Sequence, residues 1–290
     1  MRGVAPILAA ALALLLLAGC GGSDPSGEPG AAPPAPPPAT AEPEEAPEPE
    51  PAAEAGPAGA VAPAEAERRA APATGACRAG DYFRMRTPRL AYAGVVRDTV
   101  QAFRDPGRQP LARFGSVNEN GAPTVLGVLG RVVGADCRAR WYRAQLPLKP
   151  NGVVGWVPAA AIDVHPVRTR ILVELSQRRV TLWDDGRVVL RAPAAIGSAA
   201  TPTPTGSFYV NQRLRPTDPS GPFGPGAVGI SAFSDVLTGW AQGGPVALHG
   251  TNRPELIGQA VSNGCIRLRN DVLEQLFART LPGTPVVVRP

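Results

Sequence analysis

The chain has 290 residues, of which 44% are hydrophobic and 18% are charged, and its formal net charge is +5. This length accommodates about two domains, and the charge content excludes a wholly disordered acidic protein. The charge is unevenly distributed, because residues 21–76 carry 10 acidic side chains against two arginines, a net charge of −8, whereas residues 77–290 carry +12. An acidic segment is therefore joined to a strongly basic body.

The N-terminal residues predict export. An apolar run over residues 4–17 is long enough for the core of a signal peptide but shorter than the roughly 20 residues that span a membrane. The run ends in Leu17-Ala18-Gly19-Cys20, which resembles the bacterial lipobox. That resemblance implies a lipoprotein signal peptide over residues 1–20 and lipidation of Cys20; an ordinary signal peptide with a chance cysteine is the alternative.

The next segment, residues 21–76, predicts a disordered linker. It contains 14 of the 35 prolines, is rich in Ala and Glu, and is nearly free of large apolar side chains. Such a segment cannot bury enough surface to offset the entropy lost on ordering. We expect it to hold the folded domains away from a membrane surface.

Residues 77–165 predict a small β domain. Short runs of Val, Leu and Thr are separated by turn residues about every eight to twelve positions, as in all-β folds. Residues 141–146 and 153–157 flank the turn 149–152 and predict a hairpin. The ending Gly155-Trp156-Val157-Pro158 resembles bacterial SH3-like modules, small barrels that accompany wall enzymes.

The four cysteines divide by position. If Cys20 is lipidated, three thiols remain, and an oxidising compartment permits disulfides. Cys77 and Cys137 both lie in the predicted SH3-like unit and could pair, which leaves Cys265 as the odd thiol. A lone cysteine is by itself more often a small buried hydrophobe.

The surroundings of Cys265 favour catalysis instead. His249, one of two histidines, lies 16 residues upstream at the end of an apolar strand-like run, and an imidazole can activate a thiol. Gly264 directly precedes the thiol, so that backbone N–H groups there can turn toward a substrate carbonyl. His249 alone would be interpreted as a core histidine and Arg267 alone as a surface charge; the combination is the specific signal.

These residues resemble the L,D-transpeptidase (YkuD-type) family, whose pattern is His-Gly-Thr followed by Ser-x-Gly-Cys-x-Arg. Here the pattern occupies residues 249–251 and 262–267, and the resemblance covers about residues 168–290. It includes the segment 202–206, the Gly186 turn and the final strand-like run. The expected fold is thus mainly β, an SH3-like barrel followed by a β-sandwich catalytic domain with a short helix.

The resemblance implies a chemistry. Cys265 would attack the carbonyl of the third residue of a peptidoglycan stem tetrapeptide, expel the terminal D-alanine and form a thioester. An amine of a neighbouring stem, usually diaminopimelate, would then resolve the thioester as a 3→3 crosslink. His249 would hold the thiolate and shuttle the proton, with its other ring nitrogen oriented by the Gly250 carbonyl.

The family pattern also assigns supporting roles. The amides of Asn263, Gly264 and Cys265 are candidate oxyanion donors, and the Arg267 guanidinium would order the site and favour anionic groups. Many members have His where this chain has Asn263, which places the pH profile and donor preference in question. Ser262 either hydrogen-bonds the turn or merely fits it.

Two further segments predict elements near this site. Residues 211–244 are rich in Gly and Pro and too long for a simple connection, so we expect a loop covering the acyl-donor groove, or else an inert surface excursion. The run 270–274 resembles a capped helix start, and apolar residues continue at helical spacing to Phe277. This predicts a short scaffold helix.

Other functions remain as alternatives. Hydrolysis of the same thioester would make the chain an L,D-carboxypeptidase. A papain-like wall endopeptidase has its cysteine before its histidine, whereas here both His165 and His249 precede Cys265. A non-catalytic wall-binding lipoprotein would use the SH3-like module alone, which the intact motifs disfavour.

The expected partners follow from charge and export. Two histidines and scattered cysteines have no zinc-type spacing, so we expect no metal or other cofactor. Arginine richness can indicate nucleic acid, but an exported protein rarely meets it. Peptidoglycan stem peptides, the membrane through the Cys20 lipid, and anionic wall polymers are the expected partners. The protein is expected to face the cell wall and to act in its biogenesis.

Overall fold

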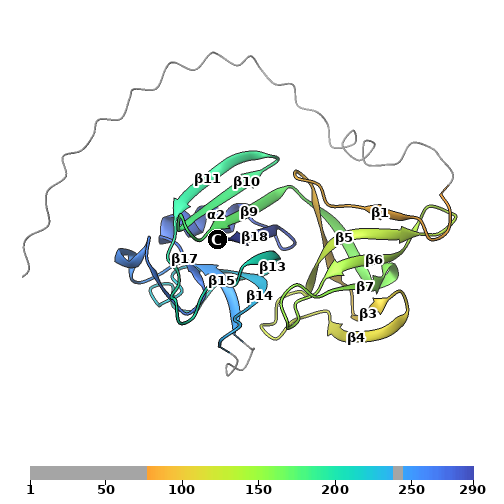
Figure 1. Cartoon of the computed structure of the whole chain (residues 1–290), viewed down its shortest axis with the longest axis horizontal. Coiled ribbons are helices and arrows are strands. Elements are labelled where there is room, and N and C mark those ends of the chain that lie inside the picture. Colours follow the sequence, from red (N-terminus) through yellow and green to blue (C-terminus); the bar gives the residue numbers. More distant parts are fainter. Residues whose placement is uncertain (1–76, 238–243) are drawn as a thin grey trace, which may run out of the picture. The chain divides into compact units, whose positions relative to one another are not determined.

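The computed structural model of the protein describes residues 77–237 and 244–290, which consist mainly of β-strands (Figure 1). All of them belong to one compact unit of the chain. The expected signal peptide, the lipidation site Cys20 and the linker 21–76 lie outside the described residues. No helix of the described part is long and apolar enough to cross a membrane.

The first part of this unit is an antiparallel sheet. Its elements are β1 (Tyr82–Arg84), β2 (Ala91–Val96), β3 (Thr99–Asp105), β4 (Arg108–Gly115), β5 (Val125–Val133), β6 (Ala139–Gln145), β7 (Val154–Pro158), the 3-10 helix η1 (Ala159–Ala161) and β8 (Ile162–Val167). The strand order is β4-β3-β7-β6-β5-β2-β8, and β1 pairs with β5. Apolar side chains of these strands, among them Leu126, Val128 and Val157, form one core cluster. The predicted hairpin is confirmed as the pair β6 and β7.

A second, mixed sheet forms the rest. Its elements are β9 (Thr169–Glu174), β10 (Arg179–Asp184), β11 (Arg187–Pro193), β12 (Ile196–Gly197), β13 (Gly206–Leu214), β14 (Ala227–Phe233), β15 (Pro245–His249), the 3-10 helix η2 (Pro254–Leu256), β16 (Ala260–Ser262), β17 (Ile266–Arg267), α2 (Asn270–Arg279) and β18 (Pro285–Arg289). The order is β11-β10-β9-β18-β13-β14-β15-β17, with β12 and β16 as a separate pair. The mainly β fold with one short helix is therefore confirmed within the described residues.

The helix α2 covers the core of this second sheet. Leu273 and Leu276 are buried, and Val272 and Phe277 are partly buried against the same cluster, as the helical spacing predicts. The predicted cap at Asn270 is wrong, because the residue preceding the helix, Arg269, makes no side-chain cap. The Asn270 side chain instead bonds the chain after β15.

The single loop predicted over residues 211–244 is wrong. Strand β13 extends to Leu214 and β14 occupies Ala227–Phe233, and these two strands pair with each other. The Gly and Pro residues cluster on either side of β14, whose own run of apolar residues is a good strand former. Residues 215–226 form the described loop beside the site. Part of the connection between β14 and β15 lies outside the described residues.

A disulfide joins Cys77 and Cys137, the two cysteines considered for pairing, across 60 residues of sequence. It ties the segment before β1 to the turn between β5 and β6. Cys265 is the free cysteine among the described residues.

Side-chain hydrogen bonds connect the two sheets. The amide of Asn118 donates to Gln212 Oε1 at 2.8 Å, and that of Asn120 donates to the same oxygen at 3.1 Å. The Gln145 amide donates to the Ser207 carbonyl at 2.8 Å. These contacts place the loop between β4 and β5 beside strand β13, at one end of the pocket described next.

Candidate active site

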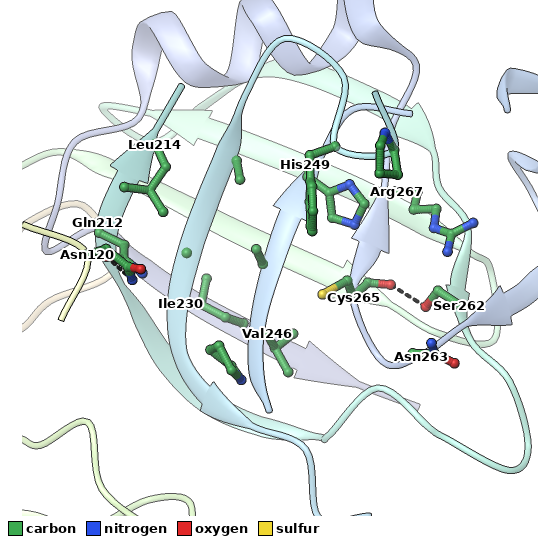
Figure 2. A pocket seen from close by; sticks show the side chains of 16 residues that line it. Asn120, Gln212, Leu214, Ile230, Val246, His249, Ser262, Asn263, Cys265 and Arg267 are labelled. Carbon is green, nitrogen blue, oxygen red and sulfur yellow. Dashed lines mark hydrogen bonds between the residues drawn. The ribbon is translucent and has the colours of Figure 1, made fainter. Parts of the chain in front are cut away.

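Two parallel strands bring the histidine and cysteine motifs together. Strands β15 and β17 pair with His249 opposite Arg267, and the Leu268 amide donates to the His249 carbonyl at 2.8 Å. Cys265 lies directly before β17, and its side chain lines the same pocket as those of His249 and Arg267. Figure 2 shows these three residues at one end of the pocket, with Asn120 and Gln212 at the other.

A tight turn presents the thiol. Ser262 is 1% exposed, and its hydroxyl donates to the Cys265 carbonyl at 2.6 Å while accepting from the Gly264 amide at 3.1 Å. Gly264 has a φ of +106°, a conformation that side-chain-bearing residues rarely adopt. The Ser262 hydroxyl therefore holds the turn rather than merely fitting it.

The hydrogen bonds of Ser262 affect which backbone amides are available as oxyanion donors. The Gly264 amide donates to the Ser262 hydroxyl, and its role as an oxyanion donor stays a prediction. The amides of Asn263 and Cys265 have no hydrogen-bond partner within the described residues. They are the donors left for a developing oxyanion.

The imidazole is fixed by the backbone. His249 is 4% exposed, and its Nδ1 lies 2.6 Å from the Gly250 carbonyl oxygen, the contact that the family resemblance implies. Because a carbonyl can only accept, Nδ1 carries the proton, and in the neutral ring Nε2 keeps its lone pair. The exposed Phe223 ring packs against this imidazole with its centroid at 5.0 Å.

The Asn270 side chain lies so close to the backbone at position 250 that only glycine fits there. A Cβ at Gly250 would overlap the Asn270 carboxamide oxygen, which accepts from the Thr251 amide at 2.8 Å. Asn270 thereby fixes the backbone that holds His249. The sequence gives no signal for this contact, because an Asn at the start of a helix ordinarily indicates a cap.

Burial and the charge of Arg267 shift the pKa values of His249 and Cys265, which the sequence did not predict. Burial, with a smaller contribution from the Arg267 charge, lowers the pKa of His249 to about 4. The hydrogen bond to Gly250 opposes this shift. Burial also raises the pKa of the Cys265 thiol, partly offset by the Ala247 backbone and by Arg267. Both shifts favour the neutral forms, a thiol beside a neutral imidazole.

The pocket has a volume of about 420 Å³. It is lined by Asn120, Gln212, Leu214, Pro222, Phe223, Ala227, Gly229, Ile230, Pro245, Val246, Ala247, His249, Ser262, Asn263, Cys265 and Arg267. Half of these residues have apolar side chains, and the polar ones include the two reacting groups, as is usual for a small-molecule site. Gln212 and Phe223 lie in the segment 211–244 that was expected to cover the groove, although neither was singled out, whereas the sequence did not indicate Asn120. Within residues 77–237 and 244–290, no group of His, Cys, Asp and Glu is arranged to hold a metal ion.

Comparison with known proteins agrees with this geometry. A model of the L,D-transpeptidase catalytic domain family, YkuD, matches residues 168–288. The putative L,D-transpeptidase YkuD of Bacillus subtilis is 35% identical over 126 residues, which cover 43% of this chain and 69% of that protein. The probable L,D-transpeptidase YcfS of Escherichia coli is 41% identical over 163 residues, 47% of this chain and 48% of that protein.

Among solved structures, the L,D-transpeptidase of Enterococcus faecium is 26% identical, with 42% of this chain and 49% of that chain covered and a TM-score of 0.33. The chain thus spans about half the length of YcfS and of the Enterococcus faecium enzyme. The residues matched by the family model include both His249 and Cys265. The chain belongs to the L,D-transpeptidase YkuD family, through a catalytic domain over residues 168–288.

Proposed function

We propose that the chain is a peptidoglycan L,D-transpeptidase that forms 3→3 crosslinks, with Cys265 as nucleophile and His249 as general acid and base. One observation carries this proposal: a neutral imidazole with its Nδ1 proton held by Gly250 lines the same cavity as the free thiol. The family membership supplies the reaction class. The substrate is a stem tetrapeptide.

The acylation step uses a neutral pair. As the Cys265 sulfur attacks the carbonyl carbon of the third stem residue, its proton passes to Nε2 of His249. The tetrahedral intermediate then collapses, the bond to the terminal D-alanine nitrogen breaks, and that nitrogen takes the proton from His249. A thioester to Cys265 and free D-alanine result.

Deacylation reverses the proton path. The amine of an acceptor stem attacks the thioester carbonyl and loses a proton to His249, and the departing sulfur recovers a proton from the imidazolium. The new amide bond is the crosslink. Water in place of the amine would give the L,D-carboxypeptidase product.

The turn and the arginine support both steps. The Asn263 and Cys265 amides, which have no hydrogen-bond partner within the described residues, are the oxyanion donors of this proposal, and preorganised donors need no rearrangement during the reaction. Arg267 lowers the pKa of both reacting groups, which favours the developing thiolate and keeps His249 unprotonated as a base. Its positive charge also suits the carboxylates of a stem peptide.

In this proposal, the remaining segments hold the catalytic domain close to the cell wall. Lipidation of Cys20 anchors the protein to a membrane, and the Pro-rich linker 21–76 carries the folded part away from that surface. The sheet over residues 77–165 acts as an SH3-like module beside the catalytic domain. Its loop residue Asn120 lines the pocket, which supports a contribution to substrate contacts.

Intact-protein mass spectrometry tests the nucleophile. After incubation with a carbapenem or a stem tetrapeptide, we expect an acyl adduct on the wild type and none on C265A. The matched control is S176A, which removes an exposed hydroxyl from the turn between β9 and β10, outside the pocket lining, and should label like the wild type. An unmodified wild-type mass, or equal labelling of C265A, would overturn the enzymatic assignment.

A further inference from the structure

A second cavity lies away from the catalytic pocket, where the two sheets meet. Its volume is about 970 Å³, and it shares no lining residue with the pocket that contains Cys265. Four arginines line it, Arg84, Arg86, Arg143 and Arg170, and no Asp or Glu does. We call these four residues the arginine basin.

Strand register explains how two of these arginines converge. Arg84 of β1 and Arg143 of β6 are both paired with Gly130 of the intervening strand β5. Side chains of residues paired across strands emerge on one face, so Arg84 and Arg143 lie on the same face of the sheet on either side of Gly130. A Cβ at Gly130 would overlap the ring of Tyr82, which also lines the basin.

The other two arginines come from the segment after β1 and from the second sheet. Arg86 is half-buried, and its guanidinium makes a long contact of 3.5 Å with Gln145 Oε1. Arg170 stacks on the Trp183 ring at 4.4 Å, and its Nε is buried without a hydrogen-bond partner within the described residues. Stacking fixes the guanidinium plane without neutralising its charge.

None of the four arginines forms an ion pair with a described residue, whereas eight other arginines do. Burial and the charges of Arg170 and Arg84 lower the pKa of Arg86. Arg84 and Arg170 thus repel Arg86, and no described carboxylate forms an ion pair with any of the four. A bound anion would remove that repulsion.

We propose that the arginine basin binds phosphate groups, of the kind carried by phosphodiester polymers and by phospholipid head groups. A phosphate has more oxygens than a carboxylate and can accept from several guanidinium forks at once. The large cavity, bounded by strands of both sheets, has room for more than one charged unit of a ligand. This site is independent of the acyl-transfer chemistry.

Binding of soluble probes to the full chain in neutral detergent tests this site by calorimetry. The probes are a glycerol phosphate oligomer, dihexanoylphosphatidylglycerol below its micelle concentration, and polyglutamate as a carboxylate control. We expect the wild type to bind the phosphate probes, more weakly as salt increases, and to bind polyglutamate poorly. Preference between the oligomer and the lipid identifies the source of the phosphate.

A charge-matched pair of variants makes the test specific. R84Q/R143Q should weaken phosphate binding by roughly tenfold or more. R187Q/R191Q removes the same charge from exposed positions on the edge strand β11 and should change affinity by less than about twofold. Thermal unfolding and alkylation of Cys265 by iodoacetamide confirm that each variant is folded. No phosphate binding by the wild type, equal loss in both variants, or equal binding of polyglutamate would overturn the proposal.

Discussion

The catalytic pocket and the arginine basin differ in how the chain assembles them and in how they carry charge. The central residues of the pocket lie between His249 and Arg267, and burial favours the neutral forms of its two reacting groups. The basin is drawn from positions 84 to 170 across both sheets and is positive without compensation. In the pocket, charged groups would form only during the reaction, whereas the arginine basin is already positive and would bind an anionic ligand.

The largest effect should come from removing the base of the pocket. H249Q keeps a polar side chain of similar size but cannot take the thiol proton, so acylation should slow by about 10²- to 10⁴-fold. Time-resolved intact-protein mass spectrometry measures this rate. Phosphate binding at the basin should be unchanged in H249Q. A loss of acylation below tenfold would contradict the role of His249.

His249 should also make stability depend on pH. Its pKa is about 4 when folded and about 6.5 in the unfolded chain, so between these values only the unfolded chain takes up the proton. The free energy of unfolding should therefore fall by up to about 3 kcal/mol as the pH drops from 6.5 to 4. Chemical unfolding of the wild type and H249Q measures the difference. The same decline in H249Q would show that other groups cause it.

A smaller effect should follow loss of the Ser262 hydroxyl. S262A leaves the Gly264 amide and the Cys265 carbonyl without their partner, and the turn that presents the thiol should loosen. We expect acylation to slow roughly tenfold. S176A is again the matched control. If S262A acylates as fast as the wild type, the turn does not depend on this hydroxyl.

The smallest effect should be on the basin in the absence of ligand. R84Q/R143Q removes like charges that flank Gly130, so at low salt the free energy of unfolding should rise by a few tenths of a kcal/mol. The gain should disappear at about 1 M salt, where screening is strong. Urea unfolding at two salt concentrations measures it. An increase of the same size in R187Q/R191Q would show that net charge alone is responsible.

The two regions also show what sequence patterns can predict. Alternation and turn residues predicted the β6–β7 hairpin, and helical spacing predicted α2, since both depend on neighbouring residues. The residues that share the pocket around Cys265 were predicted instead from the resemblance of residues 249–251 and 262–267 to the family pattern. The contact of Phe223 with His249 and the convergence of the four basin arginines depend on pairing between distant strands, which no local pattern reports.

Errors near the site have a physical cause as well. Gly and Pro on both sides of β14 gave residues 211–244 the composition of one long loop, although the strand between them is a good β former. Asn270 was expected to cap α2, but its carboxamide bonds Thr251 instead. In both cases the local sequence is compatible with two conformations, and a contact with a distant segment determines which one forms.

Product analysis of the transpeptidase reaction tests the central claim most directly. The wild type is incubated with a disaccharide tetrapeptide, and the products are separated and sequenced by mass spectrometry. The account predicts release of D-alanine together with a 3→3 crosslinked dimer, and neither product with C265A. Release of D-alanine without any dimer at high acceptor concentration would contradict the transpeptidase assignment and favour hydrolysis of the thioester.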